Sequence, residues 1–217
     1  KSDKSISDLF IRTGRIQYIV MAFILTGFIV FGKQFIILWA GSNYADVYTI
    51  ALLFFVPLTI PLIQNLGITI LQARNKVKFR ALLYFVIAVF SLGLQLLLVK
   101  KYGGIGCAAA ICVALVLGHI IVMNIYYYKY QAIDIPKFWK EIGKMSVTPL
   151  ILGIGAYILL QYISVHTILT LGVGVILFSL IYIPMFWFIG MNQSERDLMH
   201  TPVKHLLSKL GMRRLQK

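Results

Sequence analysis

Charged residues are scarce in this sequence, and acidic residues are the scarcest of them. Of the 217 residues only 13% are charged, with 7 Asp and Glu against 21 Lys and Arg, whereas 59% are hydrophobic. Soluble domains carry about 25% charged and about 45–50% apolar residues. A soluble domain of this length would need more charge to coat its surface, so we expect the remaining apolar surface to face lipid. This composition excludes a soluble enzyme and a disordered tail.

Cysteine is almost absent as well. Cys107 and Cys112 lie in one apolar run and are five residues apart, so on a helix they point in different directions. They make no disulfide framework, which excludes a small secreted scaffold, and we interpret them as small buried apolar residues. An initiator methionine and a signal peptide are also missing before Lys1. We therefore interpret the chain as a piece of a longer protein.

Patterns typical of catalysis or metal binding are missing too. The four histidines have no metal-ligand spacing, so we predict no catalytic residue, no metal and no cofactor. No long apolar run carries Asp or Glu near its middle. Ion-coupled transporters often place such a carboxylate at the coupling site, and its absence weakens the hypothesis of a proton or sodium relay.

Six apolar stretches are long enough to cross a bilayer, which takes about 20 mostly apolar residues in a helix. They are continuous rather than alternating, which argues against the strands of a barrel. We therefore predict an all-α integral membrane protein with a cytoplasmic amphipathic lead-in over 1–15, a six-helix transmembrane lobe over 16–190 and a cytoplasmic basic amphipathic tail over 191–217. The predicted spans are 16–39, 45–71, 79–99, 105–128, 147–164 and 168–190.

Basic residues lie almost entirely on one side of these spans. Residues 1–15, 72–80, 129–146 and 191–217 hold all of the 21 basic residues except Lys33, Lys100 and Lys101. An even number of spans places both ends on one side, and the positive-inside rule predicts that this side is the cytoplasm. The basic residues behind the net charge of +14 are therefore distributed as in a membrane protein, and they do not indicate nucleic-acid binding. Lys33, inside an apolar run, is expected to snorkel outward.

Amphipathic pieces occur in the predicted cytoplasmic segments. In 134–145 the apolar residues Ile135, Phe138, Trp139, Ile142 and Met145 follow helical spacing with lysines between them, and similar patterns occur near the start and in the tail. We expect each piece to lie on the inner leaflet, with its basic residues facing anionic membrane lipids.

The second predicted span combines two prolines with a row of polar residues. Pro57 and Pro61 each remove a backbone hydrogen bond, so we expect a kink that acts as a hinge. Polar side chains beyond it share one helical face, and others flank that face. One interpretation is the wall of a hydrophilic cavity that binds an anionic head group; the other is hydrogen bonding between helices. The candidates are Asn65, Thr69, Gln72 and Lys76 in the row, with Gln64, Arg74 and Lys78 beside it.

Small residues repeat every fourth position in the fourth predicted span. The repeat predicts a ridge against which a neighbouring helix packs closely, formed by Gly106, Ala110, Ala114 and Gly118. Glycines in the fifth and sixth spans are expected to bring those two helices together in the same way, namely Gly153, Gly155, Gly172 and Gly174.

Several short motifs together resemble a known family. The run FGKQFIILWAG at 31–41 is followed by Tyr44 and Ala45, by Gln64 and Asn65, by LQARNK at 71–76 and by KYGGIGCAA at 101–109. In this order and at these spacings they resemble the C-terminal half of a Wzx-type O-antigen and capsule flippase. That family belongs to the multidrug/oligosaccharidyl-lipid/polysaccharide exporter superfamily.

The resemblance implies a fold, a location and a function. It implies one lobe of a MATE-like transporter whose two six-helix lobes enclose a cationic cavity, with an N-terminal lobe of the same protein as the missing partner. It implies a bacterial inner membrane and a lipid-linked oligosaccharide of the polyprenyl-diphosphate type. This substrate would move to the outer leaflet by alternating access, for O-antigen, capsule or exopolysaccharide synthesis. No bond is made or broken, so an enzyme is not expected.

Other functions compete with this one. A multidrug exporter of the same superfamily would favour acidic or aromatic cavity groups, whereas this half offers basic and amide groups. A membrane enzyme of glycan assembly needs acid, base or metal residues near the membrane boundary, and the predicted outer loops are short. A passive scaffold predicts that neutralising Arg74, Lys76 and Lys78 leaves glycan export unchanged.

Overall fold

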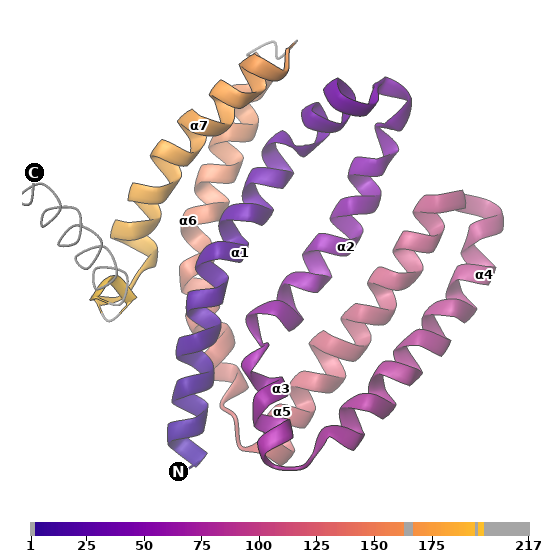
Figure 1. Cartoon of the computed structure of the whole chain (residues 1–217), viewed down its shortest axis with the longest axis vertical. Helices are drawn as coiled ribbons and strands as arrows, with labels where there is room; N and C mark the ends of the chain where they lie inside the picture. Colours follow the sequence, from indigo (N-terminus) through magenta and orange to yellow (C-terminus); the bar gives the residue numbers. More distant parts are fainter. Residues whose placement is uncertain (1–2, 163–166, 194, 198–217) are drawn as a thin grey trace, which may run out of the picture.

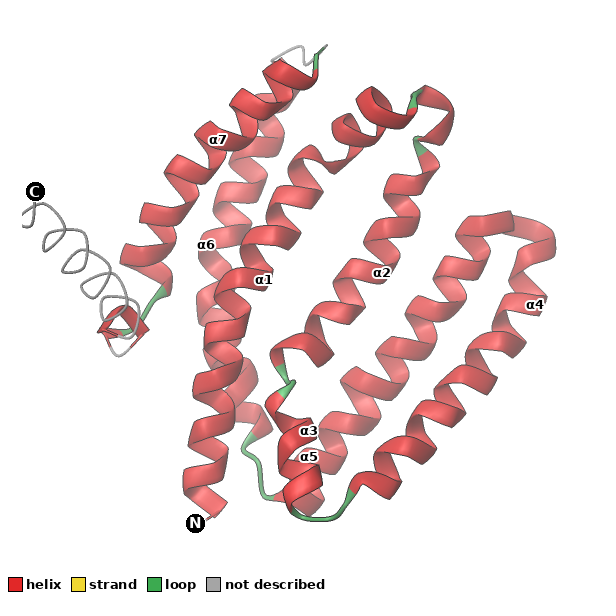
Figure 2. Cartoon of the chain, in the orientation of Figure 1, coloured by secondary structure: helices red, strands yellow, loops and turns green. Residues whose placement is uncertain are grey.

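The computed structural model describes residues 3–162, 167–193 and 195–197, and every regular element in these ranges is a helix. The helices form an elongated bundle of rods that lie side by side (Figures 1 and 2). Most of the predicted tail, residues 198–217, lies outside the described residues. The long elements are α1 (Asp3–Ala40), α2 (Asp46–Ile63), α4 (Val77–Leu115), α6 (Ile135–Tyr162) and α7 (Ile168–Met185). The short ones are a 3₁₀ turn (Ser42–Tyr44), α3 (Leu66–Ala73), α5 (Met123–Gln131) and π-helical stretches at Val116–Val122 and Phe186–Gly190.

Five helical segments are long and apolar enough to cross a membrane: Asp3–Ala40, Ser42–Ile63, Val77–Gln131, Ile135–Tyr162 and Ile168–Gly190. The third of them has 55 residues and contains a break at Gly103, where φ is 56° and ψ is −136°. A glycine adopts this positive φ without the steric cost of a side chain. Figure 1 shows that the ribbon of α4 doubles back within this segment. Its two limbs cover the predicted spans 79–99 and 105–128.

The connections rich in basic residues gather at one end of the bundle. The start of α1, the α3–α4 connection and the α5–α6 connection lie together at the lower end in Figure 1. The α1–α2 connection and the reversal of α4 lie at the opposite end. The separation between connections rich in basic residues and connections poor in them, which the sequence predicts, is therefore also a separation in space.

The predicted lead-in is part of the bundle, since α1 runs without interruption from Asp3 to Ala40. Phe10 on its first turns is buried against Tyr127 and Phe138. The first turns of α6 also belong to the core, because their apolar residues are buried, namely Ile135, Phe138, Ile142 and Met145. These apolar faces pack into the protein core and not onto a lipid leaflet, which corrects the expectation of membrane-surface helices.

The small-residue ridge faces the other limb of α4. Gly106, Ala110, Ala114 and Gly118 are all buried. A Cβ atom added to Gly118 would overlap the Ile87 side chain, and one added to Gly106 would lie 2.6 Å from the Leu98 carbonyl oxygen. The absence of a side chain at these two positions lets the limbs approach closely.

The glycines of the last two long helices contact α1 instead of each other. A Cβ on Gly153 of α6 would lie 2.9 Å from Thr26 Cγ2, and one on Gly174 of α7 would lie 3.3 Å from the Phe31 ring. Within the described part of the chain, such a Cβ on Gly155 or Gly172 would lie within 4 Å of no atom beyond its chain neighbours and its own helix backbone. The expectation that these glycines join α6 to α7 is therefore wrong, and α1 is the helix that both pack against.

Candidate functional site

The second predicted span divides into two helices, and the division lies beyond its prolines. Pro57 and Pro61 both lie inside α2, which ends at Ile63. A proline has no N–H for the carbonyl four residues earlier and crowds it, which weakens the helix nearby. The N–H of Asn65 then bonds to the Leu62 carbonyl at 3.3 Å and not to a carbonyl four residues back. The structure thus has a joint at 64–65, just after Pro61, between α2 and α3.

Gln64 holds this joint against α5. Its side chain is buried, and its Nε2 donates to Asn124 Oδ1 at 2.8 Å. Asn124 Nδ2 in turn donates to the Ile120 carbonyl at 2.7 Å. Gln64 therefore agrees with the second interpretation of the polar residues, in which they form hydrogen bonds between helices. The sequence does not reveal the pair, because its two members are 60 residues apart.

Arg74 also joins elements within the bundle. Its Nη1 donates to the Gln131 carbonyl at 2.8 Å, and its Nη2 forms an ion pair with Asp3 at 2.5 Å. These contacts connect the end of α3 to α5 and α1. The charge of Arg74 is balanced by Asp3, whereas Lys76 and Lys78 form no ion pair with any residue that the structure describes.

Lys76 lies in a turn after α3 and not on the helical face predicted for it. Asn75 has a φ of 54°, the left-handed conformation in which Asn commonly ends a helix. The N–H of Lys76 donates to the Leu71 carbonyl at 2.8 Å. A hydrogen bond between residues five apart is typical of a Schellman motif at a helix end. The prediction that the polar row continues to Lys76 is therefore wrong. Lys76 and Lys78 are nevertheless both exposed at this end of the bundle.

Three predicted residues remain together on one exposed face of α3. We call Asn65, Thr69 and Gln72 the α3 polar row. All three are exposed, and none has a side-chain hydrogen bond to any residue that the structure describes. Polar side chains without protein partners are costly against hydrocarbon, so this face requires water or another protein surface.

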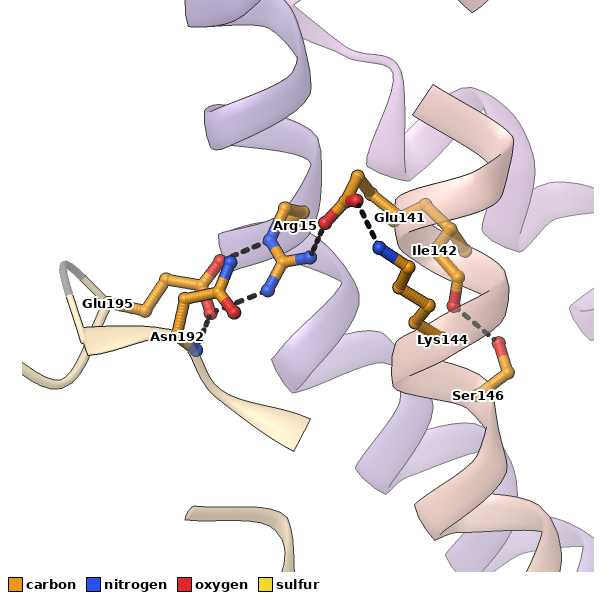
Figure 3. A network of polar contacts seen from close by, with 7 residues as sticks. All are labelled: Arg15, Glu141, Ile142, Lys144, Ser146, Asn192 and Glu195. Atoms are coloured by element: carbon orange, nitrogen blue, oxygen red, sulfur yellow. Dashed lines mark hydrogen bonds and ion pairs between the residues drawn. The ribbon is translucent and has the colours of Figure 1, made fainter. Parts of the chain in front are cut away.

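A buried cluster of charges joins α1, α6 and the residues after α7 (Figure 3). Arg15 is 5% exposed. Its Nε lies 2.5 Å from Glu195 Oε1, and its Nη1 lies 2.6 Å from Glu141 Oε2. Glu195 also accepts the Asn192 N–H at 2.8 Å, and Lys144 pairs with Glu141 at 2.9 Å. Because acidic residues are few, the sequence indicates that an acidic residue in a basic segment has a cationic partner. It does not identify Arg15 as the partner of Glu141 and Glu195.

A groove runs between α1 and α6 above that cluster. One cavity of about 490 Å³ has walls that are almost wholly apolar, and Tyr18, Thr26, Ser146, Pro149 and Gly153 are among its lining residues. At its lower end the Tyr18 and Ser146 hydroxyls hydrogen bond at 2.5 Å. A second cavity of about 440 Å³ adjoins it, because Ile29 and Tyr157 line both.

The second cavity, which we call the outer pocket, is polar. It lies between α1, the start of α2 and the end of α6, and its walls include Lys33, Gln34, Asp46, Tyr48 and Gln161. Lys33, expected only to snorkel, is thus part of a pocket that the sequence does not predict. Its polar residues come from three segments that are far apart along the chain.

Nothing in the described ranges resembles a catalytic metal centre, since no three His, Cys, Asp or Glu side chains there are close enough to hold an ion. The described residues offer polar surfaces and cavities. No protein-family model, no curated protein and no solved structure matches this chain significantly.

Proposed function

We propose that this chain is one lobe of a transporter that moves a lipid-linked oligosaccharide across the bacterial cytoplasmic membrane. In this proposal the chain crosses the membrane six times, with the reversal at Gly103 joining the third and fourth crossings. The end that holds the basic connections faces the cytoplasm, as the positive-inside rule requires.

The α3 polar row is the observation that supports the proposal most. The apolar helices of this bundle suit a membrane, yet Asn65, Thr69 and Gln72 are exposed and have no partner among the described residues. A second lobe opposite α3 would enclose this face in a wet cavity. Lys76 and Lys78 at the basic end would then attract the phosphates of a lipid-linked head group.

The joint at 64–65 gives the proposed transport a moving part. Pro57 and Pro61 weaken the end of α2, whereas Gln64 and Arg74 hold the α3 side against α5 and α1. We infer that α2 bends against a fixed α3 during alternating access. The substrate needs only binding and release along this path, and no bond of it is made or broken.

Glycan export by the full-length protein in its native host tests the proposal. We expect the double variant Lys76→Gln, Lys78→Gln to lower surface glycan severalfold in a strain that lacks the chromosomal gene. Its control is Lys100→Gln, Lys101→Gln, which removes the same charge from the opposite end and should leave export unchanged. Equal export by both variants would contradict the proposal and favour a passive scaffold.

A further inference from the structure

The outer pocket contains one cation and one anion that are not paired with each other. Lys33 on α1 and Asp46 at the start of α2 both line it. Neither side chain forms an ion pair or a hydrogen bond with any residue in the described ranges. Because the two charges have opposite sign, the pocket as a whole is close to neutral.

An amide oxygen in the same pocket also has no partner. Gln34 Oε1 is shielded from solvent, and no described residue donates a hydrogen bond to it. The Tyr48 hydroxyl, by contrast, already donates to the Ile29 carbonyl at 2.7 Å. Because Gln34 Oε1 is shielded, the groups that the pocket offers a ligand are one positive group, Lys33, and one negative group, Asp46.

The surroundings of the pocket indicate the level of lipid head groups. Trp39 and Tyr44, at the end of α1 and in the turn after it, are both largely exposed. Exposed Trp and Tyr at helix ends are typical of the membrane interface. The adjoining apolar cavity continues from Ile29 and Tyr157 toward Tyr18 between α1 and α6. A polar head in the outer pocket would have room for a hydrocarbon chain in that cavity.

We propose that the outer pocket binds a zwitterionic phospholipid with a primary ammonium, of the phosphatidylethanolamine type, with one acyl chain in the α1–α6 groove. Lys33 binds the phosphate, and Asp46 accepts hydrogen bonds from the ammonium. A purely anionic head group fits less well, since Asp46 repels it. A purely cationic ligand is repelled by Lys33. This site is independent of the transport proposed above, which rests on α3 at the other end of the bundle.

Binding of short-chain phospholipids to the purified, delipidated full-length protein in maltoside detergent tests this assignment. The probes are dioctanoyl phosphatidylethanolamine, dioctanoyl phosphatidylcholine and dioctanoyl phosphatidylglycerol, measured by native mass spectrometry and by titration calorimetry. The first two have the same charges and differ in the N–H donors, which the choline head lacks. We expect the ethanolamine lipid to bind about tenfold more tightly than the choline lipid, the size of one charge-assisted hydrogen bond.

Two substitutions and a control assign the contacts. Asp46→Asn should abolish the preference for the ethanolamine lipid over the choline lipid. Lys33→Gln should weaken the binding of both lipids about tenfold. Lys100→Gln, also at the reversal end but outside the pocket, should change neither. Each variant is compared with the wild type for its melting temperature, and if a variant does not fold, the three lipids on the wild type decide the question.

Three results would overturn the assignment. Equal binding of the ethanolamine and choline lipids would show that the ammonium donors are not recognised. Binding of the glycerol lipid as tight as that of the ethanolamine lipid would identify a site for anionic head groups. If Lys100→Gln weakened lipid binding as much as Lys33→Gln does, the lipids would be attracted to basic surface residues in general and not to this pocket.

Discussion

At the scale of single residues, polar side chains in this bundle fall into two groups. Gln64, Asn124, Arg15 and Arg74 are joined to partners on other helices. The α3 polar row has no such partner in the part of the chain that the structure describes. Both groups look alike in the sequence, because the partners are 60 to 180 residues away. A polar residue is therefore a candidate for ligand contact only after its partner has been sought in space.

Replacing Arg15 by Met is expected to destabilise the protein severely. The substitution leaves Glu195 buried without its cation, and loss of one member of a buried ion pair costs about 3–5 kcal/mol. The measurement is thermal unfolding of the purified protein in detergent. Lys144→Gln is the control, since its ammonium is exposed and such pairs contribute about 0–1 kcal/mol. A melting temperature for Arg15→Met that equals that of the control would refute the role assigned to the cluster.

The Gln64–Asn124 pair is expected to show coupling. Asn124→Leu alone leaves the Gln64 amide buried without its partner, at a cost of about 1–3 kcal/mol. Adding Gln64→Leu removes the unsatisfied group, so the double variant should lose less stability than the sum of the single ones. A double-mutant cycle on the free energy of unfolding measures this difference. Strict additivity would show that the contact does not hold the joint.

At the scale of elements, apolar length predicts the long helices, whereas small-residue spacing predicts the contact between the limbs of α4 but not the packing of α6 and α7. The apolar runs coincide with the long helices, and the basic connections coincide with one end. The sequence does not predict the joint at 64–65 or the helix end at Asn75, because each depends on local backbone geometry. It also misassigns the faces of the lead-in and of 134–145, since an apolar stripe packs equally well on lipid or on protein.

The contact between the two limbs of α4 gives a prediction at this scale. Gly118→Ala places a methyl group against the Ile87 side chain and is expected to cost about 1–3 kcal/mol of stability, because Ile87 must leave its conformation or the limbs must separate. Gly93→Ala is the matched control, since apart from its chain neighbours and the backbone of its own helix no described atom lies within 4 Å of such a Cβ. Alanine is the better helix former, so the control should be neutral or slightly stabilising. Thermal unfolding compares the two, and equal shifts would exclude close packing at Gly118.

At the scale of the whole molecule, α1 organises the bundle. It contacts α2, α6 and α7, supplies Arg15 to the buried cluster and forms a wall of both cavities. The outer pocket and the face of α3 are thus separate surfaces, at the reversal end and the basic end. The sequence predicts polar residues of the second surface. The first could not be predicted, because its polar lining comes from three segments that only the fold brings together.

The accessibility of Thr69 to water tests the central claim most directly. A single cysteine at position 69, in full-length protein in which Cys107, Cys112 and any cysteine outside these 217 residues are replaced by alanine, is treated with a membrane-impermeant maleimide in inside-out membrane vesicles. Leu92→Cys in the same background is the control, because Leu92 is an exposed apolar residue of α4 within a predicted span. We predict rapid labelling at position 69 and none at position 92. Absence of labelling at both positions would place the α3 polar row away from water and would contradict a cavity open to the cytoplasm.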